Sequence, residues 1–160
     1  MAVDMFLKIA GISGEAQDDK HKEEIDVLAW SWGMAQSASA HVGGGGGAGK
    51  VNVHDLSLTK HIDKSSPDLY LSCCSGKHLG NAVLTVRKAG ESPLEYLVIT
   101  MEDVIIAGVS TGGSGGEDRL TENVTLNFAK VKVDYTEQTS KGGSAAKPKM
   151  GWDIAKNVKI

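Results

Sequence analysis

The chain has 160 residues and a mass of 16.8 kDa, a length that fits one domain spanning residues 1–160. Its 20 glycines and its aromatic content of only 5% predict a core made mainly of Val, Ile and Leu side chains on strands. A formal net charge of −3 argues against nucleic acid as the main partner, because phosphate binding needs a basic face.

Three segments in the first 60 residues are predicted to be strands, because apolar and polar residues alternate along them. The first spans Val3 to Ile9, the second residues 24–36 and the third residues 51–58. In the second and third segments the apolar residues change from odd to even positions. Side chains on a strand alternate between its two faces, so each change predicts a bulge or a bend.

One helix is predicted at about residues 66–76. Ser66 is expected to cap it, Pro67 suits the first helical position and Gly76 suits the residue after the last turn. We expect the helix to cover a side or an end of the β structure through an apolar stripe. That stripe is expected to consist of Leu69, Tyr70, Cys73 and Cys74.

The second half of the chain is again predicted to be β structure. In chain order we expect strands at 82–87 and 95–109, a glycine turn at Gly112–Gly116, a long strand at 120–135, a flexible tail at 136–150 and a last strand at 152–160. The long strand changes parity near Ala129, and its length with a bend indicates a curved wall. The predicted fold class is therefore mainly β, a barrel or sandwich of bent antiparallel strands with one short α-helix.

Two glycine-rich motifs match the residue pattern of functional signatures but lack the flanking residues and secondary structure that those signatures require. Gly44 to Lys50 is spaced like a phosphate-binding loop, yet Val51 replaces the Ser or Thr that holds magnesium, and a strand follows instead of a helix. We interpret this segment as a hairpin loop. Gly112–Gly116 is spelled like a nucleophile elbow, but a strand follows it, and the last histidine, His78, lies upstream. Neither motif supports an enzyme.

The histidines and cysteines form no metal or redox motif. The histidines at positions 21, 41, 54, 61 and 78 include no close pair and are expected to face solvent. Cys73 and Cys74 are adjacent, which disfavours a disulfide between them and suggests a reducing compartment. We therefore predict no metal, no cofactor and no catalytic residue.

Trp30, Ser31 and Trp32 have two interpretations. Alternation places both indoles on one face of the strand and Ser31 on the other. In the simpler interpretation the tryptophans belong to the core and Ser31 faces solvent. In the other, Ser31 lines the lumen of a ring, where a small uncharged side chain would admit cargo. The sequence leaves both open.

Four segments, taken in order, cover almost the whole chain. They are AVDMFLKIAGISGE at 2–15, EEIDVLAWSWGMAQS at 23–37, GGGGGAGKVNVHDLSLTKHIDKSSP at 43–67 and STGGSGGEDRLTENV at 110–124. In this combination they resemble the Hcp family, the haemolysin-coregulated proteins that form the inner tube of the bacterial type VI secretion system. The tail at 136–150 matches no pattern of the family.

The resemblance implies hexameric rings that stack into a hollow tube, are propelled outward by a contracting sheath and carry small effectors in their lumen. The implied partners are copies of the same chain, a spike protein at the tube tip, the sheath and small effector proteins. The resemblance also implies a loop that extends from the ring and helps rings to stack. This loop contains Gly43, Gly44, Gly45, Gly46, Gly47 and Lys50.

Such a protein is expected in the cytoplasm before firing and outside the cell afterwards. The first twenty residues mix charged with apolar residues and do not form a signal peptide, and no run of about 18 apolar residues predicts a membrane span. Two other classes are a ligand-binding β-barrel, which would need clustered exposed aromatic residues, and an enzyme. A monomer in solution would favour the ligand-binding barrel, and a ring would favour the tube subunit.

Overall fold

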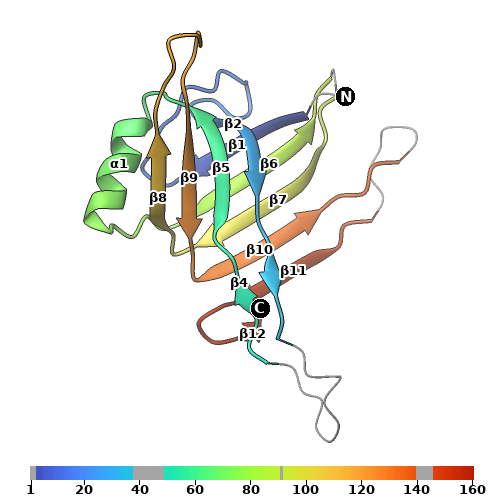
Figure 1. Ribbon diagram of the computed structural model, residues 1–160. Helices are drawn as coiled ribbons and strands as arrows, with labels where there is room; N and C mark the ends of the chain where they lie inside the picture. Colours follow the sequence, from blue (N-terminus) through green and yellow to red (C-terminus); the bar gives the residue numbers. More distant parts are fainter. Residues whose placement is uncertain (1–2, 38–48, 91, 140–145) are drawn as a thin grey trace, which may run out of the picture.

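The computed structural model describes residues 3–37, 49–90, 92–139 and 146–160 (Figure 1). The elements up to the helix are β1 (Val3–Ile9), β2 (Ile25–Ser31), β3 (Met34–Ala35), β4 (Asn52–Val53), β5 (Leu56–His61) and α1 (Ser66–Ser75). The elements after it are β6 (Ala82–Lys88), β7 (Glu95–Glu102), β8 (Ile105–Thr111), β9 (Thr121–Asn127), β10 (Lys130–Tyr135), β11 (Lys149–Asp153) and β12 (Val158–Lys159). The predicted fold class, mainly antiparallel β with one short helix, is confirmed.

Ten strands form one sheet in the order β12-β11-β10-β7-β6-β1-β2-β5-β9-β8, and β3 pairs separately with β4. Figure 1 shows that this sheet folds over on itself. A front layer of β2, β5, β9 and β8 crosses a back layer of β1, β6, β7, β10 and β11, and α1 packs beside β8. Such crossing layers need strongly twisted and bent strands.

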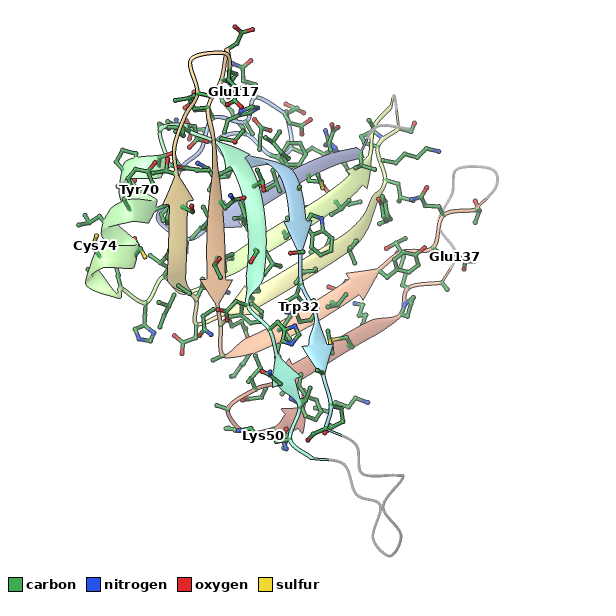
Figure 2. All side chains as sticks on the ribbon, in the orientation of Figure 1. Trp32, Lys50, Tyr70, Cys74, Glu117 and Glu137 are labelled. Atoms are coloured by element: carbon green, nitrogen blue, oxygen red, sulfur yellow. The ribbon has the colours of Figure 1, made fainter. Side chains whose placement is uncertain are left out.

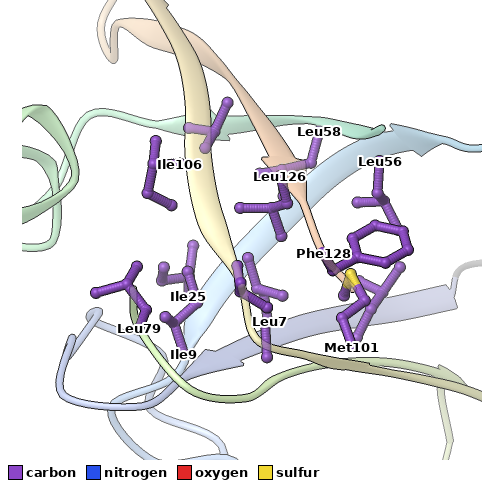
Figure 3. Close-up of a cluster of buried hydrophobic side chains, with 14 of the residues drawn as sticks. Leu7, Ile9, Ile25, Leu56, Leu58, Leu79, Met101, Ile106, Leu126 and Phe128 are labelled. Atoms are coloured by element: carbon purple, nitrogen blue, oxygen red, sulfur yellow. The ribbon is translucent and has the colours of Figure 1, made fainter. Parts of the chain in front are cut away.

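The core fills the space between the two layers (Figure 3). Leu7 and Met101 enter it from the back layer, and Leu58 and Leu126 enter it from the front layer. All four are at most 2% exposed. Burying one such side chain stabilises a fold by about 1.5 to 3 kcal/mol, so this aliphatic cluster is the main source of stability. The predicted reliance on aliphatic side chains is confirmed.

The three parity changes have three different structural causes. In β2 the pairing with β5 shifts between Val27 and Ala29, so Leu28 is the extra residue of a bulge. In the segment 51–58 the change falls between two separate strands, β4 and β5. The third change shows that the prediction of one long strand at 120–135 is wrong. The chain turns at Phe128 and Ala129 from β9 in the front layer to β10 in the back layer, and buried Phe128 fills that corner.

Two other predicted strands are each a pair of strands. The range 95–109 divides into β7 and β8 at Asp103, whose φ is 60°. The range 152–160 is not one strand, because β11 and β12 pair as a hairpin with Asn157 at φ 54° in the turn. β11 begins at Lys149, inside the range expected as a tail. Asp and Asn tolerate the left-handed region, so these turns form without the glycine or proline that marks a turn in sequence.

Candidate assembly surface

The outward side of the front layer carries small uncharged residues, and we call this surface the neutral face. Its residues form two rungs across β2, β5, β9 and β8. The rungs are Ser31-Ser57-Thr125-Gly108 and Ala29-Thr59-Asn123-Ser110. All eight residues are exposed or half-buried, and a hollow of about 230 Å³ lies among Ser31, Thr59 and Asn123. The face therefore offers hydroxyl and amide groups but no charge.

Ser31 belongs to this face, and the tryptophans beside it lie behind it. Trp30 and Trp32 are half-buried and pack against the core, whereas Ser31 is exposed. The Trp32 indole, labelled in Figure 2, donates a hydrogen bond of 2.9 Å to the carbonyl oxygen of His54. Alternation thus predicted the two sides correctly. That Ser31 lines a lumen stays a prediction.

Within the ranges that the structure describes, the front layer ends on either side in an edge with unpaired backbone. β1 pairs with β2 only at Ile25 and Asp26, so the outer edge of β2 from Val27 to Ser31 has no strand partner in the described part of the chain. At the other side β8 is the last strand of the order, and beyond one isolated bridge at its first residue its outer edge has no strand partner among the described residues. Its ladder with β9 skips Ala107, a bulged and exposed residue. Unpaired edges are templates for adding a strand from another chain.

Directly behind the neutral face lies a buried charge network. Lys60 Nζ is 2.6 Å from Glu122 Oε2 and 3.1 Å from Asp63 Oδ1. Ser66 donates to the same Glu122 oxygen over 2.6 Å, and Tyr70 donates to the other oxygen. Burial by itself raises the pKa of Glu122, but the hydrogen bonds from Lys60, Ser66 and Tyr70 outweigh it and hold this pKa below its ordinary value. The network joins β5, β9 and α1.

The start of α1 differs from its prediction. Ser66 is the first helical residue and not the cap, because its hydroxyl is committed to Glu122. The cap position is occupied by Ser65, whose side chain makes no capping hydrogen bond and instead donates to Asp63. Gly76, in the left-handed region at φ 66°, ends the helix as predicted.

The predicted apolar stripe of α1 is wrong in part. Leu69 is buried as expected, but the other buried positions are Ser66 and Ser72, and Cys74 is exposed (Figure 2). The helix packs through a narrow side of small residues because it lies close against β8 and the charge network. Both cysteines, Cys73 and Cys74, are free thiols.

Each glycine motif falls between two consecutive strands of the chain. β3 and β4 pair as a hairpin, and its connecting segment contains the predicted stacking loop. Gly43, Gly44, Gly45, Gly46 and Gly47 lie outside the described residues. Lys50 is exposed and is followed by strand β4 and not by a helix, which removes the context of a phosphate site. Gly112–Gly116 connects β8 to β9, which confirms the predicted glycine turn.

The histidines differ from their prediction in two cases. His54 and His78 are exposed as expected, and His41 lies outside the described residues. His61 is half-buried, and its Nδ1 atom is buried. His21, in contrast, is only 7% exposed and stacks on Phe6 with ring centroids 4.5 Å apart. Within the ranges that the structure describes, no three His, Cys, Asp or Glu side chains are grouped so that they could hold a metal ion.

Comparison with known proteins places the chain in a family. Residues 6–135 match the family described as type VI secretion system effector, Hcp. The chain belongs to the Hcp family. It is 67% identical over 160 residues to protein hcp1 of Pseudomonas aeruginosa, with 99% of each chain covered. Hcp1 from Salmonella typhimurium has a crystal structure that matches with a TM-score of 0.82 at 45% identity over the full length of both chains.

A second solved structure, of a type six secretion system protein, gives a TM-score of 0.93 at 26% identity and covers 99% of this chain and 100% of that one. The predicted family is therefore confirmed, and the chain is a type VI secretion system protein. Hcp proteins are secreted components of that system and are not a known enzyme family. Among the described residues, no helix has the length and apolar character needed to cross a membrane.

Proposed function

We propose that this chain is the structural subunit of the type VI secretion tube. Copies assemble into hexameric rings, the rings stack into a hollow tube, and the tube leaves the cell when the system fires. The mechanism is self-assembly without catalysis, and residues 1–160 act as a single Hcp-like β-barrel domain. The match to the Hcp family over residues 6–135 supports this proposal.

The observation that carries the proposal is the neutral face with an unpaired edge on either side. The edge of β8 in one subunit pairs with the edge of β2 at Val27 to Ser31 in the next. Because the two edges differ, each contact is head-to-tail, and repetition closes a ring when the rotation between neighbours divides a full turn. The front layers then form a continuous inner wall. The neutral face lines the lumen, where uncharged hydroxyl and amide groups contact small effectors without selecting them by charge.

The remaining partners act at the ends and outside of the tube. Rings stack through the loop that contains Gly43 to Gly47 and Lys50. A spike protein sits on the tip and the contractile sheath surrounds the tube. The subunit resides in the cytoplasm before firing and in the medium or the target cell afterwards.

The first test is the native mass, measured by light scattering on a sizing column and followed by negative-stain imaging. We expect a mass near six times 16.8 kDa and ring-shaped particles. A chain that stays monomeric at high concentration would contradict the proposal and favour a ligand-binding barrel.

The edge contact is tested by Ala107→Pro. Proline suits a bulge on an edge strand but cannot donate a backbone hydrogen bond to an added strand. We expect a folded chain, judged by circular dichroism, that no longer forms rings at concentrations where the wild type does. Ala107→Ser keeps the backbone N–H and is the matched control. Rings of Ala107→Pro that persist on dilution like the wild type would exclude this edge from the contact.

Cargo contact is tested by Ser31→Gln. The longer side chain projects from the neutral face, so we expect reduced retention of a small effector and an unchanged ring mass. Effector retention equal to the wild type would exclude Ser31 from the cargo surface.

A further inference from the structure

The outward side of the back layer is covered, unlike the neutral face. Residues 13–24, which we call the cover segment, belong to the blue loop that joins β1 to β2 (Figure 1). Phe6, Thr85 and Arg87 point away from the core, yet they are only 5%, 4% and 6% exposed. Their burial is explained by the cover segment, which bonds to Arg87 through Asp18 and stacks on Phe6 through His21.

His21 joins the cover segment to β7 through its two ring nitrogens. Nδ1 lies 2.8 Å from Glu24 Oε2, and Nε2 lies 2.6 Å from Glu95 Oε1 on β7. A neutral imidazole has only one N–H, so its second nitrogen would bring a lone pair against a carboxylate oxygen. Only the doubly protonated ring donates to both carboxylates. The geometry therefore requires His21, Glu24 and Glu95 to share one proton more than a neutral imidazole and two carboxylates carry.

The surrounding charges favour this proton on the ring. The groups around His21 are Asp18 and Glu24 of the cover segment, Asp4 of β1, Arg87 of β6 and Glu95 of β7. They comprise four carboxylates and one guanidinium, so a second cation reduces an excess of negative charge. The imidazolium also stacks on Phe6 with an interplanar angle of 8°, an arrangement that attracts a cation to the ring.

We propose that His21 is a proton-dependent latch, which in its imidazolium form fastens the cover segment to β7 through Glu95. Loss of the ring proton places a lone pair against one carboxylate and weakens that fastening. The cover segment then opens from the back layer and exposes Phe6 and Arg87. Lys64, which follows β5, still holds the cover segment through Glu15 and Glu23, so the opening is confined to the part that His21 fastens.

The first experiment measures hydrogen exchange by mass spectrometry at pH 6.0 and pH 8.5 on the wild-type chain, with correction for the intrinsic exchange rates. We expect protection of residues 13–24 to fall by about tenfold or more at the higher pH, because one hydrogen bond between charged groups is lost there. Residues 121–127 of β9 are the internal reference and should not change. Equal protection of the cover segment at both values would overturn the proposal.

The charge state is measured directly by ¹⁵N NMR of the His21 ring at pH 6.0, where the cover segment is expected to be closed. We expect both ring nitrogens of His21 to carry a proton in this closed arrangement, because each lies within hydrogen-bond distance of a carboxylate. One unprotonated ring nitrogen would overturn the proposal without any variant.

Three variants separate the latch from a merely structural role. In Glu95→Gln the amide group donates to an unprotonated nitrogen, so we expect high protection at both pH values. His78→Gln removes an exposed histidine with one carboxylate partner, Asp103, and should keep the wild-type response. In Gly14→Ala the added Cβ would lie 2.4 Å from the backbone oxygen of Glu24. We expect this clash to keep the cover segment open, so the variant gives the protection of an open segment at both pH values. A full pH response in Glu95→Gln, or its loss in His78→Gln, would overturn the latch.

Discussion

Two adjacent rungs of the β5–β9 ladder face opposite sides of the same wall. Thr59 lies opposite Asn123 on the outside, and Lys60 lies opposite Glu122 on the inside. The outer pair is joined by one hydrogen bond of 2.7 Å at the surface. The inner pair is fully buried and joined at 2.6 Å. The outer pair is open to solvent, whereas the buried inner charges depend on protein partners.

This difference separates two roles that one strand pair serves. The inner rung fixes α1 and β9 relative to each other, since removing any partner would leave a charge buried without compensation. The outer rung leaves a surface whose side chains contribute little to folding and are therefore available to a neighbour or to cargo. Substitutions one residue apart in sequence should therefore differ greatly in their effect on the free energy of unfolding.

The largest expected effect comes from Glu122→Ala. It leaves the buried Lys60 ammonium without its main partner, and breaking a buried pair in this way costs about 3 to 5 kcal/mol. The free energy of unfolding should be measured by chemical denaturation at one fixed protein concentration, because assembly also adds stability.

The matched control for this variant replaces both charges, as Lys60→Met with Glu122→Leu. Replacing a whole buried pair by apolar groups of similar volume is often close to neutral, so the double variant should be more stable than Glu122→Ala. A single variant that loses less than about 1 kcal/mol would contradict the importance of the inner rung.

Acid should weaken the same network. Because the pKa of Glu122 is lower in the folded chain than in the unfolded chain, the carboxylate stabilises the fold fully above the ordinary glutamate value of about 4.3. That stabilisation is lost as pH falls through the lowered folded value, at about 1.4 kcal/mol for each unit of difference.

The measurement is the free energy of unfolding from pH 7 to pH 2, compared with Tyr70→Phe. That variant removes one donor to Glu122, so the folded pKa is lowered less, and the acid loss should be smaller and complete at a higher pH than in the wild type. Identical acid profiles would show that Tyr70 does not hold the Glu122 charge.

A smaller effect is expected from Asp18→Asn beside the cover segment. The hydrogen bond from Arg87 holds the pKa of Asp18 below its ordinary value, against a smaller opposing effect of burial. Asp18 is partly exposed and its pair is screened by water, so the loss of stability should be well below that of Glu122→Ala. The measurement is thermal melting of Asp18→Asn and Glu122→Ala at pH 7. A larger loss of stability in Asp18→Asn than in Glu122→Ala would contradict this expectation.

Alternation and glycine spacing were sufficient to predict the fold class, the helix position and the bulge in β2. They could not predict the turns at Asp103 and Asn157, since both residues adopt φ near 60° without a glycine. Lys60 and Glu122 carried a signal that was overlooked. Each lies in phase with buried leucines, and two opposite charges on inward positions of two strands indicate a buried pair.

The pairing of β2 with β5 and of β5 with β9 also had to come from the structure, because alternation fixes the face of a residue but not its neighbour on the next strand. The neutral face exists only through that pairing. Ser31 was singled out from the sequence, whereas Thr125 and Gly108, in the same rung, were not. The His21 latch was missed for a related reason, since Glu95 lies 74 residues away along the chain.

The smallest effect is expected from Thr59→Val on the outer rung. Valine keeps the shape and the β-branching of threonine, so packing along β5 is preserved and only the hydrogen bond to Asn123 is lost. Asn123 is exposed and bonds to water instead, so the free energy of unfolding should change by less than about 0.5 kcal/mol. Denaturation of Thr59→Val beside Glu122→Ala measures the contrast directly. A loss above about 2 kcal/mol in Thr59→Val would mean that the neutral face is needed for folding, and a surface needed for folding would not be free to serve as the wall of a lumen.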